Sequence, residues 1–338
     1  MRELLKTEHL SVSFFTKSGE VEAVRDVSLT VEEGEVLAIV GESGCGKSAL
    51  CKSIMKLLPK TAKIKSGKIL ADGIDITDYT QRNMSRLRGD LFSMIFQDPM
   101  TALNPTMTIG KQIEEAVRIH NKKMPKKQVK KKVLELMQLV EIDEPEVRIS
   151  QYPHEFSGGM RQRAVMAIAL AGNPKILFAD EPTTALDVTI QAQILDVFRR
   201  IQKKLGMATV FISHDLGVVA GVADRVAVMY AGKIVEIGTA EEIFYDPRDP
   251  YTWGLLQSLP ILSRGKEWLP TLPGMPPTLI HPPKGDAFAE RNAYAMRIDY
   301  EKEPPVFQVT DTHYAATWLL DERAPKVKAP IGERRYGK

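Results

Sequence analysis

The residues best suited to chemistry lie in one stretch, Gly41–Ser48, with the sequence GESGCGKS. It fits the pattern G-x-x-x-x-G-K-[ST], in which backbone N–H groups of a glycine-rich loop hold phosphate at the start of a helix. In this pattern the lysine, Lys47, reaches the β- and γ-phosphates, and the Ser48 hydroxyl ligates Mg²⁺. We therefore predict a nucleotide site. Its expected contact residues are Gly41, Glu42, Ser43, Gly44, Cys45, Gly46, Lys47, Ser48 and Ala49.

Two adjacent carboxylates, Asp180 and Glu181, follow the apolar run Ile176–Ala179. A continuous apolar run of this length is typical of a buried parallel strand. Its end would place Asp180 beside a bound Mg²⁺ and Glu181 toward the γ-phosphate. Glu181 is the candidate general base, a role that contributes about 10²–10⁴-fold in rate.

Gln97 and His214 each follow a further predicted strand, and Pro99 ends the first of these. Open α/β sheets bind ligands at the carboxyl ends of their strands, so both positions favour a role at the nucleotide. Gln97 could reach Mg²⁺ or the attacking water, and His214 could contact the γ-phosphate. The ordinary alternatives are a loop glutamine and a structural histidine.

The segment FSGGMRQR offers a second place for an anion, at Ser157, Gly158 and Gly159. Serine is a good N-cap, and the glycines leave backbone N–H groups open at a positive helix terminus. A capped helix after a turn, with no ligand, is the alternative.

These positions require strands and helices that can hold them, and the expected fold class is α/β. Val36–Val40 reads as a buried strand of a parallel sheet with helices. Val27, Leu29 and Val31 alternate, as in an antiparallel β part. We expect a mostly helical insertion from about residue 97 to 156, and a hairpin over 225–238 that turns at Ala231-Gly232.

Proline content sets a C-terminal accessory region, residues 246–338, apart from residues 1–245, which carry the motifs described above. The accessory region holds 13 of the 21 prolines and reads as extended and rich in turns. The net charge of +3 is small for this length and demands neither a nucleic acid nor a membrane partner. The two cysteines, Cys45 and Cys51, suit a reducing cytoplasm. No signal peptide and no apolar run of 18 residues is present.

Seven lysines lie within Lys122–Lys132. A solvated helix face is the favoured interpretation. Anionic lipid under a membrane partner is the second, because a lysine near such a surface gains about 1 kcal/mol. Nucleic-acid contact is the third, and is weakened because no aromatic residue is interleaved for stacking.

Taken in order, these motifs and Ala185-Leu186-Asp187 resemble the nucleotide-binding domain of ABC ATPases over about residues 1–245. The resemblance implies that two such domains bind head to tail, with each ATP between one domain's phosphate loop and the other's Ser157, Gly158 and Gly159. It also implies adenine stacking on Phe14 or Phe15, with Phe14 favoured. Met160 replaces the more usual glutamine of the signature.

Three further stretches are similar to the ATPases of oligopeptide and dipeptide permeases: DPMTALNP at 98–105, DPYTWGLL at 249–256, and the tail from Leu272 to Leu320. The D-subunit type of oligopeptide importer is most similar. The resemblance implies a peripheral subunit at the cytoplasmic face of the membrane. Its partners would be a second ATPase, with a heterodimer favoured, two multi-span permease subunits and an extracytoplasmic peptide-binding protein, with no nucleic acid.

Many of these relatives carry four tail cysteines that look like iron–sulfur ligands. The corresponding residues here are Asp286, Asn292, Asp299 and Thr317, and without thiolates no cluster is expected. The tail would instead fold by packing Phe288, Tyr294, Phe307 and Trp318. The alternatives for the whole chain are an importer of dipeptides or nickel, and a soluble ABC ATPase acting on nucleic acid or ribosomes. The last usually has two cassettes, a coiled coil or zinc cysteines, which this sequence lacks.

Overall fold

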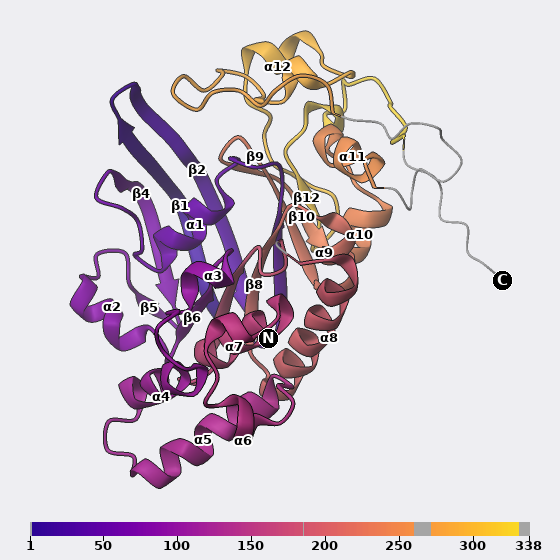
Figure 1. The fold of residues 1–338 in the computed structure, drawn as a ribbon. Coiled ribbons are helices and arrows are strands. Elements are labelled where there is room, and N and C mark those ends of the chain that lie inside the picture. Colours follow the sequence, from indigo (N-terminus) through magenta and orange to yellow (C-terminus); the bar gives the residue numbers. More distant parts are fainter. Residues whose placement is uncertain (1, 185, 260–271, 331–338) are drawn as a thin grey trace, which may run out of the picture. The chain divides into compact units, whose positions relative to one another are not determined.

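The computed structural model describes residues 2–184, 186–259 and 272–330 (Figure 1). Two compact units can be separated, and each is described by itself. The first comprises residues 1–4, 31–36 and 78–212, and the second comprises 5–30, 37–77 and 213–338. In the described ranges, no helix is both long and apolar enough to cross a membrane.

The first unit is built on three parallel strands in the order β8-β7-β6. These are β6 (Phe92–Ile95), β7 (Ile176–Asp180) and β8 (Ala208–Ser213). Every residue of β7 and β8 is buried, as expected for parallel strands covered on both faces. The carboxyl ends of these strands carry Gln97, two residues beyond β6, and Glu181, directly after β7.

Helices make up the rest of the first unit. They are α2 (Gln81–Leu87), α3 (Pro99–Ala102), α4 (Ile109–His120), α5 (Lys126–Leu139), α6 (Pro145–Arg148), the 3₁₀ turn η1 (Pro153–Glu155), α7 (Gly158–Ala169) and α8 (Val188–Leu205). The segment between Gln97 and Phe156 is therefore helical, as predicted. On α5 the buried residues Val129, Val133 and Leu136 recur at helical spacing and form one apolar face.

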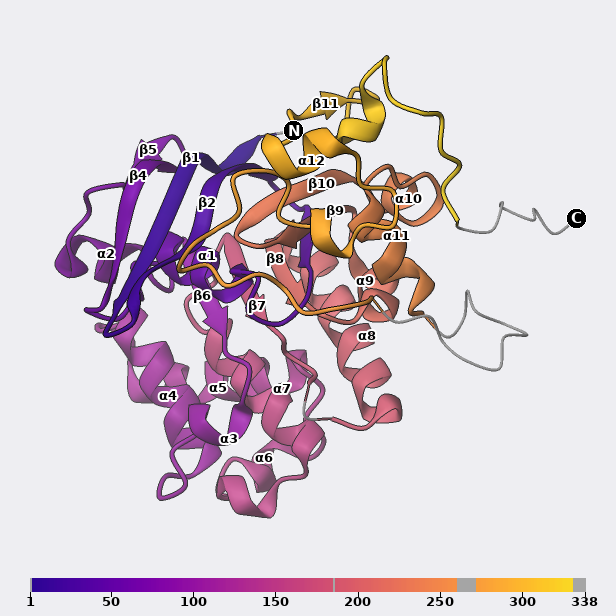
Figure 2. The same ribbon diagram turned by 90° about the horizontal axis from the view of Figure 1, so that it is seen from above.

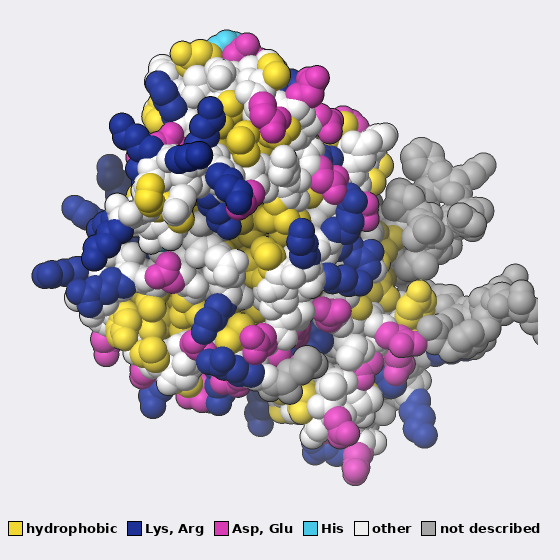
Figure 3. Space-filling view, turned by 90° about the horizontal axis from the view of Figure 1, so that it is seen from below, with side chains coloured by type: hydrophobic (Ala, Val, Ile, Leu, Met, Phe, Trp, Pro, Cys, Tyr) yellow, Lys and Arg dark blue, Asp and Glu magenta, His cyan; other side chains and the backbone are white. Residues whose placement is uncertain are grey.

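The lysines of the basic run Lys122–Lys132 occupy the other side of α5 and the turn before it. Six of the seven are exposed, and Lys132 is half-buried. Lysine and arginine side chains extend from the surface on the face shown in Figure 3, chiefly along its left edge. A solvated face accounts for these positions, and the lipid and nucleic-acid interpretations stay predictions.

The second unit contains two sheets. One has the order β2-β1-β4-β5, from β1 (Glu3–Thr16), β2 (Gly19–Glu32), β4 (Ala62–Ala71) and β5 (Ile74–Asp75), and its pairs β1–β4 and β4–β5 are antiparallel. Val27, Leu29 and Val31 are buried on β2, so the predicted alternation is present. This sheet is the expected antiparallel β part.

The second sheet of this unit has the order β11-β12-β10-β9-β3. Its strands are β3 (Val36–Val40), β9 (Arg225–Tyr230), β10 (Lys233–Thr239), β11 (Phe307–Gln308) and β12 (Tyr314–Ala315). β3 runs parallel to β9, and β9 and β10 form the predicted hairpin. Both turn residues, Ala231 and Gly232, have positive φ, which suits the two-residue turn that right-twisted strands require. The C-terminal strand β12 pairs with β10 (Figure 1), and β11, which is labelled in Figure 2, pairs with β12, so both extend this sheet.

The helices of the second unit are α1 (Lys47–Ile54), α9 (Leu216–Val222), α10 (Ala240–Tyr245), α11 (Pro250–Gln257) and α12 (Arg297–Glu301), with 3₁₀ turns η2 (Ala289–Arg291) and η3 (Trp318–Leu320). The α/β fold class is thus confirmed. The division at residue 245/246 stays a prediction, and residues 260–271 and 331–338 of the predicted accessory region lie outside the described residues.

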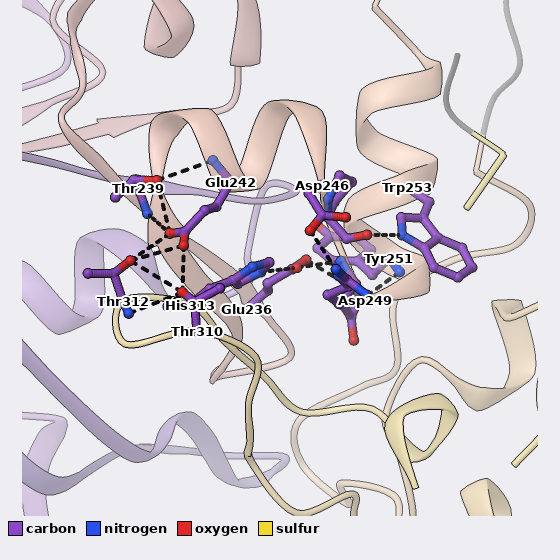
Figure 4. Close-up of polar contacts among 12 residues, drawn as sticks. Glu236, Thr239, Glu242, Asp246, Asp249, Tyr251, Trp253, Thr310, Thr312 and His313 are labelled. Carbon is purple, nitrogen blue, oxygen red and sulfur yellow. Dashed lines mark hydrogen bonds and ion pairs between the residues drawn. The ribbon is translucent and has the colours of Figure 1, made fainter. Parts of the chain in front are cut away.

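A buried polar cluster joins β10, α11 and the tail (Figure 4). The Glu236 carboxylate is 1% exposed and accepts hydrogen bonds from the backbone N–H groups of Arg248 (2.5 Å) and Asp249 (3.2 Å). Its Oε1 also lies 2.7 Å from Nε2 of His313, which is fully buried. Burial first, and then the charge of Glu236, raises the pKa of Asp249 well above its ordinary value. The tail is therefore fixed to the sheet by paired polar groups.

Candidate functional site

Two positions of the phosphate loop between β3 and α1 can be occupied only by glycine. Gly41 and Gly46 have φ of 149° and 107°. A Cβ on Gly41 would lie 2.1 Å from the Met229 carbonyl oxygen, and one on Gly46 would lie 2.2 Å from that of Ala23. The backbone of β9 and β2 thus presses on the loop, and side chains are excluded where the chain curls at the helix start.

Lys47 begins α1 and its side chain turns back into the loop. Its Nζ donates to the carbonyl oxygens of Gly41 (2.7 Å) and Glu42 (2.9 Å), and the residue is 5% exposed. A buried ammonium with backbone partners is held in one place. Ser48 follows it and is half-buried. The loop therefore presents a fixed positive charge, a hydroxyl and the open N–H groups of a helix start, which suit a nucleotide's phosphates.

Cys45 is a residue of this loop and has 5% of its surface exposed. Burial raises the pKa of its thiol, although Lys47 acts in the opposite direction. Burial therefore disfavours the thiolate, which is the nucleophilic form of cysteine.

The carboxylates stand at the end of β7. Asp180 is its last residue and is 4% exposed. Glu181 follows with φ of 48°, in the left-handed region, and its N–H donates to the Ile212 carbonyl (3.0 Å). The Glu181 Oε2 accepts from Gln97 Nε2 (3.1 Å) and from Thr184 Oγ1 (3.0 Å). Two predicted catalytic residues, Gln97 and Glu181, are thus brought into contact.

Thr184 was missed by sequence reasoning. Its signal was weak, since a threonine three residues after a carboxylate is common. The hydrogen bond from its hydroxyl helps to fix the orientation of the Glu181 carboxylate and supports its negative charge.

Ser157 caps α7 as predicted, and its Oγ accepts from the Met160 N–H (3.3 Å). A Cβ on Gly159 would lie 2.7 Å from Ile190 Cγ2, so α8 packs closely against the start of α7. Ser157, Gly159 and Met160 open onto a cavity of about 480 Å³. This helix start is accessible, as an anion-binding terminus requires.

The remaining predicted positions are His214, Phe14 and the motif Ala185-Leu186-Asp187. His214 directly follows β8 and is exposed. Phe14 is half-buried on β1, and Phe15 is 40% exposed with Lys63 and Lys65 near its ring (5.8 and 5.5 Å). The choice of Phe14 for adenine stays a prediction. In the motif Ala185-Leu186-Asp187, Ala185 lies outside the described residues, and Asp187 caps α8 by accepting from the Ile190 N–H (2.9 Å).

The four tail residues Asp286, Asn292, Asp299 and Thr317 do not fit an iron–sulfur cluster, because cluster ligands are thiolates and the chain's two cysteines are elsewhere. Each side chain instead accepts a backbone N–H: Asp286 from Phe288 (2.9 Å), Asn292 from Tyr294 (2.9 Å), Asp299 from Met296 (2.6 Å) and Thr317 from Leu319 (3.3 Å). Among the residues that the structure describes, no three or more His, Cys, Asp or Glu side chains are grouped as metal ligands.

Aromatic packing in the tail differs in part from expectation. The Phe288 ring is buried against Tyr230 (5.4 Å) and Tyr251 (5.3 Å), and Tyr294 packs edge-on against Trp253 (5.4 Å). Phe307 and Trp318 are only half-buried. The tail thus packs its aromatic rings on β9 and α11, rather than forming a core of its own.

Comparison with known proteins agrees with this geometry. Residues 24–184 match the family described as ABC transporter, and residues 235–298 match the family described as oligopeptide/dipeptide transporter, C-terminal region. The oligopeptide transport ATP-binding protein OppD of Bacillus subtilis is 59% identical over 97% of this chain and 92% of its own. The dipeptide transport ATP-binding protein DppD of Lactococcus lactis is 57% identical over 96% and 93%.

Among solved structures, a dimeric ATP-binding cassette in a post-hydrolysis state, bound to ADP and Pi, is similar with a TM-score of 0.63 and 26% identity. The match covers 70% of this chain and 99% of that cassette. The remainder of this chain therefore extends beyond a minimal cassette.

Proposed function

Because the chain belongs to the family of ATP-binding subunits of oligopeptide and dipeptide ABC transporters, we propose that it hydrolyses ATP to drive uptake of oligopeptides. The observation that carries the proposal is the 59% identity to an oligopeptide transport protein across 97% of the chain, tail included. A dipeptide substrate is the second candidate, favoured by the 57% identity to a dipeptide transport protein. Substrate choice would lie in the other subunits.

In this proposal the loop Gly41–Ala49 holds the phosphates, with Lys47 on the β- and γ-phosphates and Phe14 against adenine. The residues present fit Mg²⁺, because Ser48, Asp180 and Gln97 supply hydroxyl, carboxylate and amide oxygens, the ligands that this ion prefers. Bound Mg²⁺ would neutralise charge on the phosphates.

Glu181 would accept a proton from the attacking water. Gln97 and Thr184 support this role, since their hydrogen bonds orient the Glu181 carboxylate. His214 would contact the γ-phosphate. Ser157, Gly158 and Gly159 would serve the nucleotide of the partner ATPase in a head-to-tail pair, and the partner is proposed to be a similar second subunit.

The subunit would act at the cytoplasmic face of the membrane on two permease subunits that receive peptides from an extracytoplasmic binding protein. Affinity purification from gently solubilised membranes should recover four partners: the second ATPase subunit, the two permease subunits and the binding protein. Recovery of ribosomal proteins or nucleic acid in their place would overturn the transport role and leave the ATPase chemistry standing.

The variant Glu181→Gln tests the chemistry in the assembled transporter. Turnover should fall by at least about 100-fold, the lower range for loss of a general base, while ATP binding is kept and the closed dimer accumulates. Thr184→Ala is a milder companion that removes one hydrogen bond to the same carboxylate. Undiminished hydrolysis in Glu181→Gln would remove Glu181 from the base role.

A further inference from the structure

A bidentate ion pair joins the C-terminal tail to the phosphate loop. The guanidinium of Arg291 lies 2.6 Å (Nη1) and 2.9 Å (Nη2) from the two carboxylate oxygens of Glu42. Arg291 ends η2, 249 residues after Glu42, and is 7% exposed. Paired N–H···O bonds of this kind fix orientation as well as charge, because both groups are planar.

The guanidinium is itself held in place by other groups. Its Nε donates to the Pro273 carbonyl (2.7 Å) and its Nη1 donates to the Tyr230 hydroxyl (3.1 Å). The rings of Tyr230 and Phe288 each lie 5.7 Å from its centre. Because these groups surround the buried Arg291 side chain, the guanidinium is restricted to the position in which it pairs with Glu42.

Glu42 is held at three points. Its carboxylate is paired with Arg291, its N–H donates to the Tyr251 hydroxyl (2.8 Å), and its carbonyl accepts from Lys47 Nζ (2.9 Å). Two of these partners, Tyr251 on α11 and Arg291, follow residue 245. The third is the lysine that reaches the phosphates in this type of loop.

We propose that Arg291 is a positioning residue for the phosphate loop. By holding Glu42 it keeps the loop backbone and Lys47 in the arrangement that receives phosphate, so that little ordering remains to be done when nucleotide binds. The inference rests on the proposed function, that this loop binds ATP. It gives the accessory region a role at the nucleotide site and predicts an effect on ATP affinity rather than on the chemical step.

The test compares Arg291→Gln with wild type in the assembled transporter, through the KM and kcat for ATP and the Kd for a fluorescent ATP analogue. KM and Kd should rise by at least about fivefold, the lower range of coupling between sites, with kcat nearly unchanged. Arg297→Gln is the matched control. It lies in the same tail and pairs with Glu301 (2.7 Å), but its side chain is 93% exposed and wild-type KM is expected.

Glu42→Gln removes the other partner of the same ion pair, the carboxylate in the loop. It keeps the proposal testable if Arg291→Gln fails to fold. It should raise KM by a similar factor, and the double variant should be no worse than the single ones, because both remove one interaction. An unchanged KM in a folded Arg291→Gln or Glu42→Gln, or effects that multiply in the double variant, would overturn the proposal. Wild type that binds no ATP would instead overturn the proposed function on which it rests.

Discussion

The Asp286 carboxyl in the tail is half-buried, and its negative charge destabilises the folded state. Replacing Asp286 with asparagine should therefore raise the free energy of unfolding. Burial, and then the nearby Asp299 and Glu303 carboxylates, raise the pKa of Asp286 from 3.8 to about 6. Its Oδ1 accepts the Phe288 N–H (2.9 Å). Asparagine keeps an oxygen for this hydrogen bond and carries no charge, so Asp286→Asn should keep the turn and remove the repulsion.

The size of the effect follows from the two pKa values. The difference between 3.8 and about 6 corresponds to about 3 kcal/mol between the protonation states. Because the folded state holds this proton more tightly than the unfolded state, the free energy of unfolding decreases as pH rises through this window. Above pH 7 the wild type loses this full amount of stability, and well below pH 3.8, the ordinary pKa of the group, it loses none. Asp286→Asn should therefore gain up to about 3 kcal/mol at pH 7.5 and almost nothing at pH 4.

The measurement is urea unfolding of both proteins, followed by tryptophan fluorescence, at pH 4 and 7.5. Asp321→Asn is the matched control, because hydrogen bonds from Arg323 lower the pKa of Asp321 and removing that charge should bring no gain. A variant that is no more stable than wild type at pH 7.5, or that gains equally at both pH values, would refute the reasoning.

Two further variants test the loop and the polar cluster. Gly46→Ala would place a Cβ 2.2 Å from the Ala23 carbonyl oxygen and should abolish binding of a fluorescent ATP analogue. In Gly44→Ala the new Cβ meets no atom within 4 Å, so this variant bears only about 1–2 kcal/mol of backbone strain. Tighter binding by Gly46→Ala than by Gly44→Ala would contradict the loop geometry. Glu236→Ala removes the carboxylate that pairs with His313 and accepts from two backbone N–H groups. The free energy of unfolding, measured in urea, should fall by about 3–5 kcal/mol. The control Glu290→Ala changes an exposed residue and should lower it by less than about 0.5 kcal/mol. Equal stability of these two would show that the cluster contributes nothing.

Local patterns were enough to predict much of this molecule. The apolar runs of β3, β7 and β8 read correctly as buried strands, because parallel strands covered on both faces need no alternation. The loop glycines could be read because the curl of the chain at Gly41 and Gly46 leaves no room for a side chain. The pair Ala231-Gly232 marked a hairpin for a similar reason, since both residues have positive φ.

The contacts that could not be predicted are those between two residues whose types no sequence motif specifies. Glu42 occupies a position where the loop pattern accepts any residue, and Arg291 follows a proline-rich stretch without periodicity. Their pairing depends on the tertiary fold, which places Arg291 beside Tyr230 and Pro273 and which no local spacing encodes. Thr184 is a similar case, because its role depends on the left-handed turn at Glu181.

The four tail positions are held by local hydrogen bonds within their turns. Asp286, Asn292 and Thr317 each accept the N–H of the residue two places later, which is what short oxygen-bearing side chains do in turns. Such a bond fixes the local backbone without any link between the four positions. The long-range links of the tail include the rings packed on Tyr230 and Tyr251, the His313–Glu236 pair and the Arg291–Glu42 pair. The Arg291–Glu42 pair thus links the tail directly to the phosphate loop, at the point where we propose that the tail influences nucleotide binding.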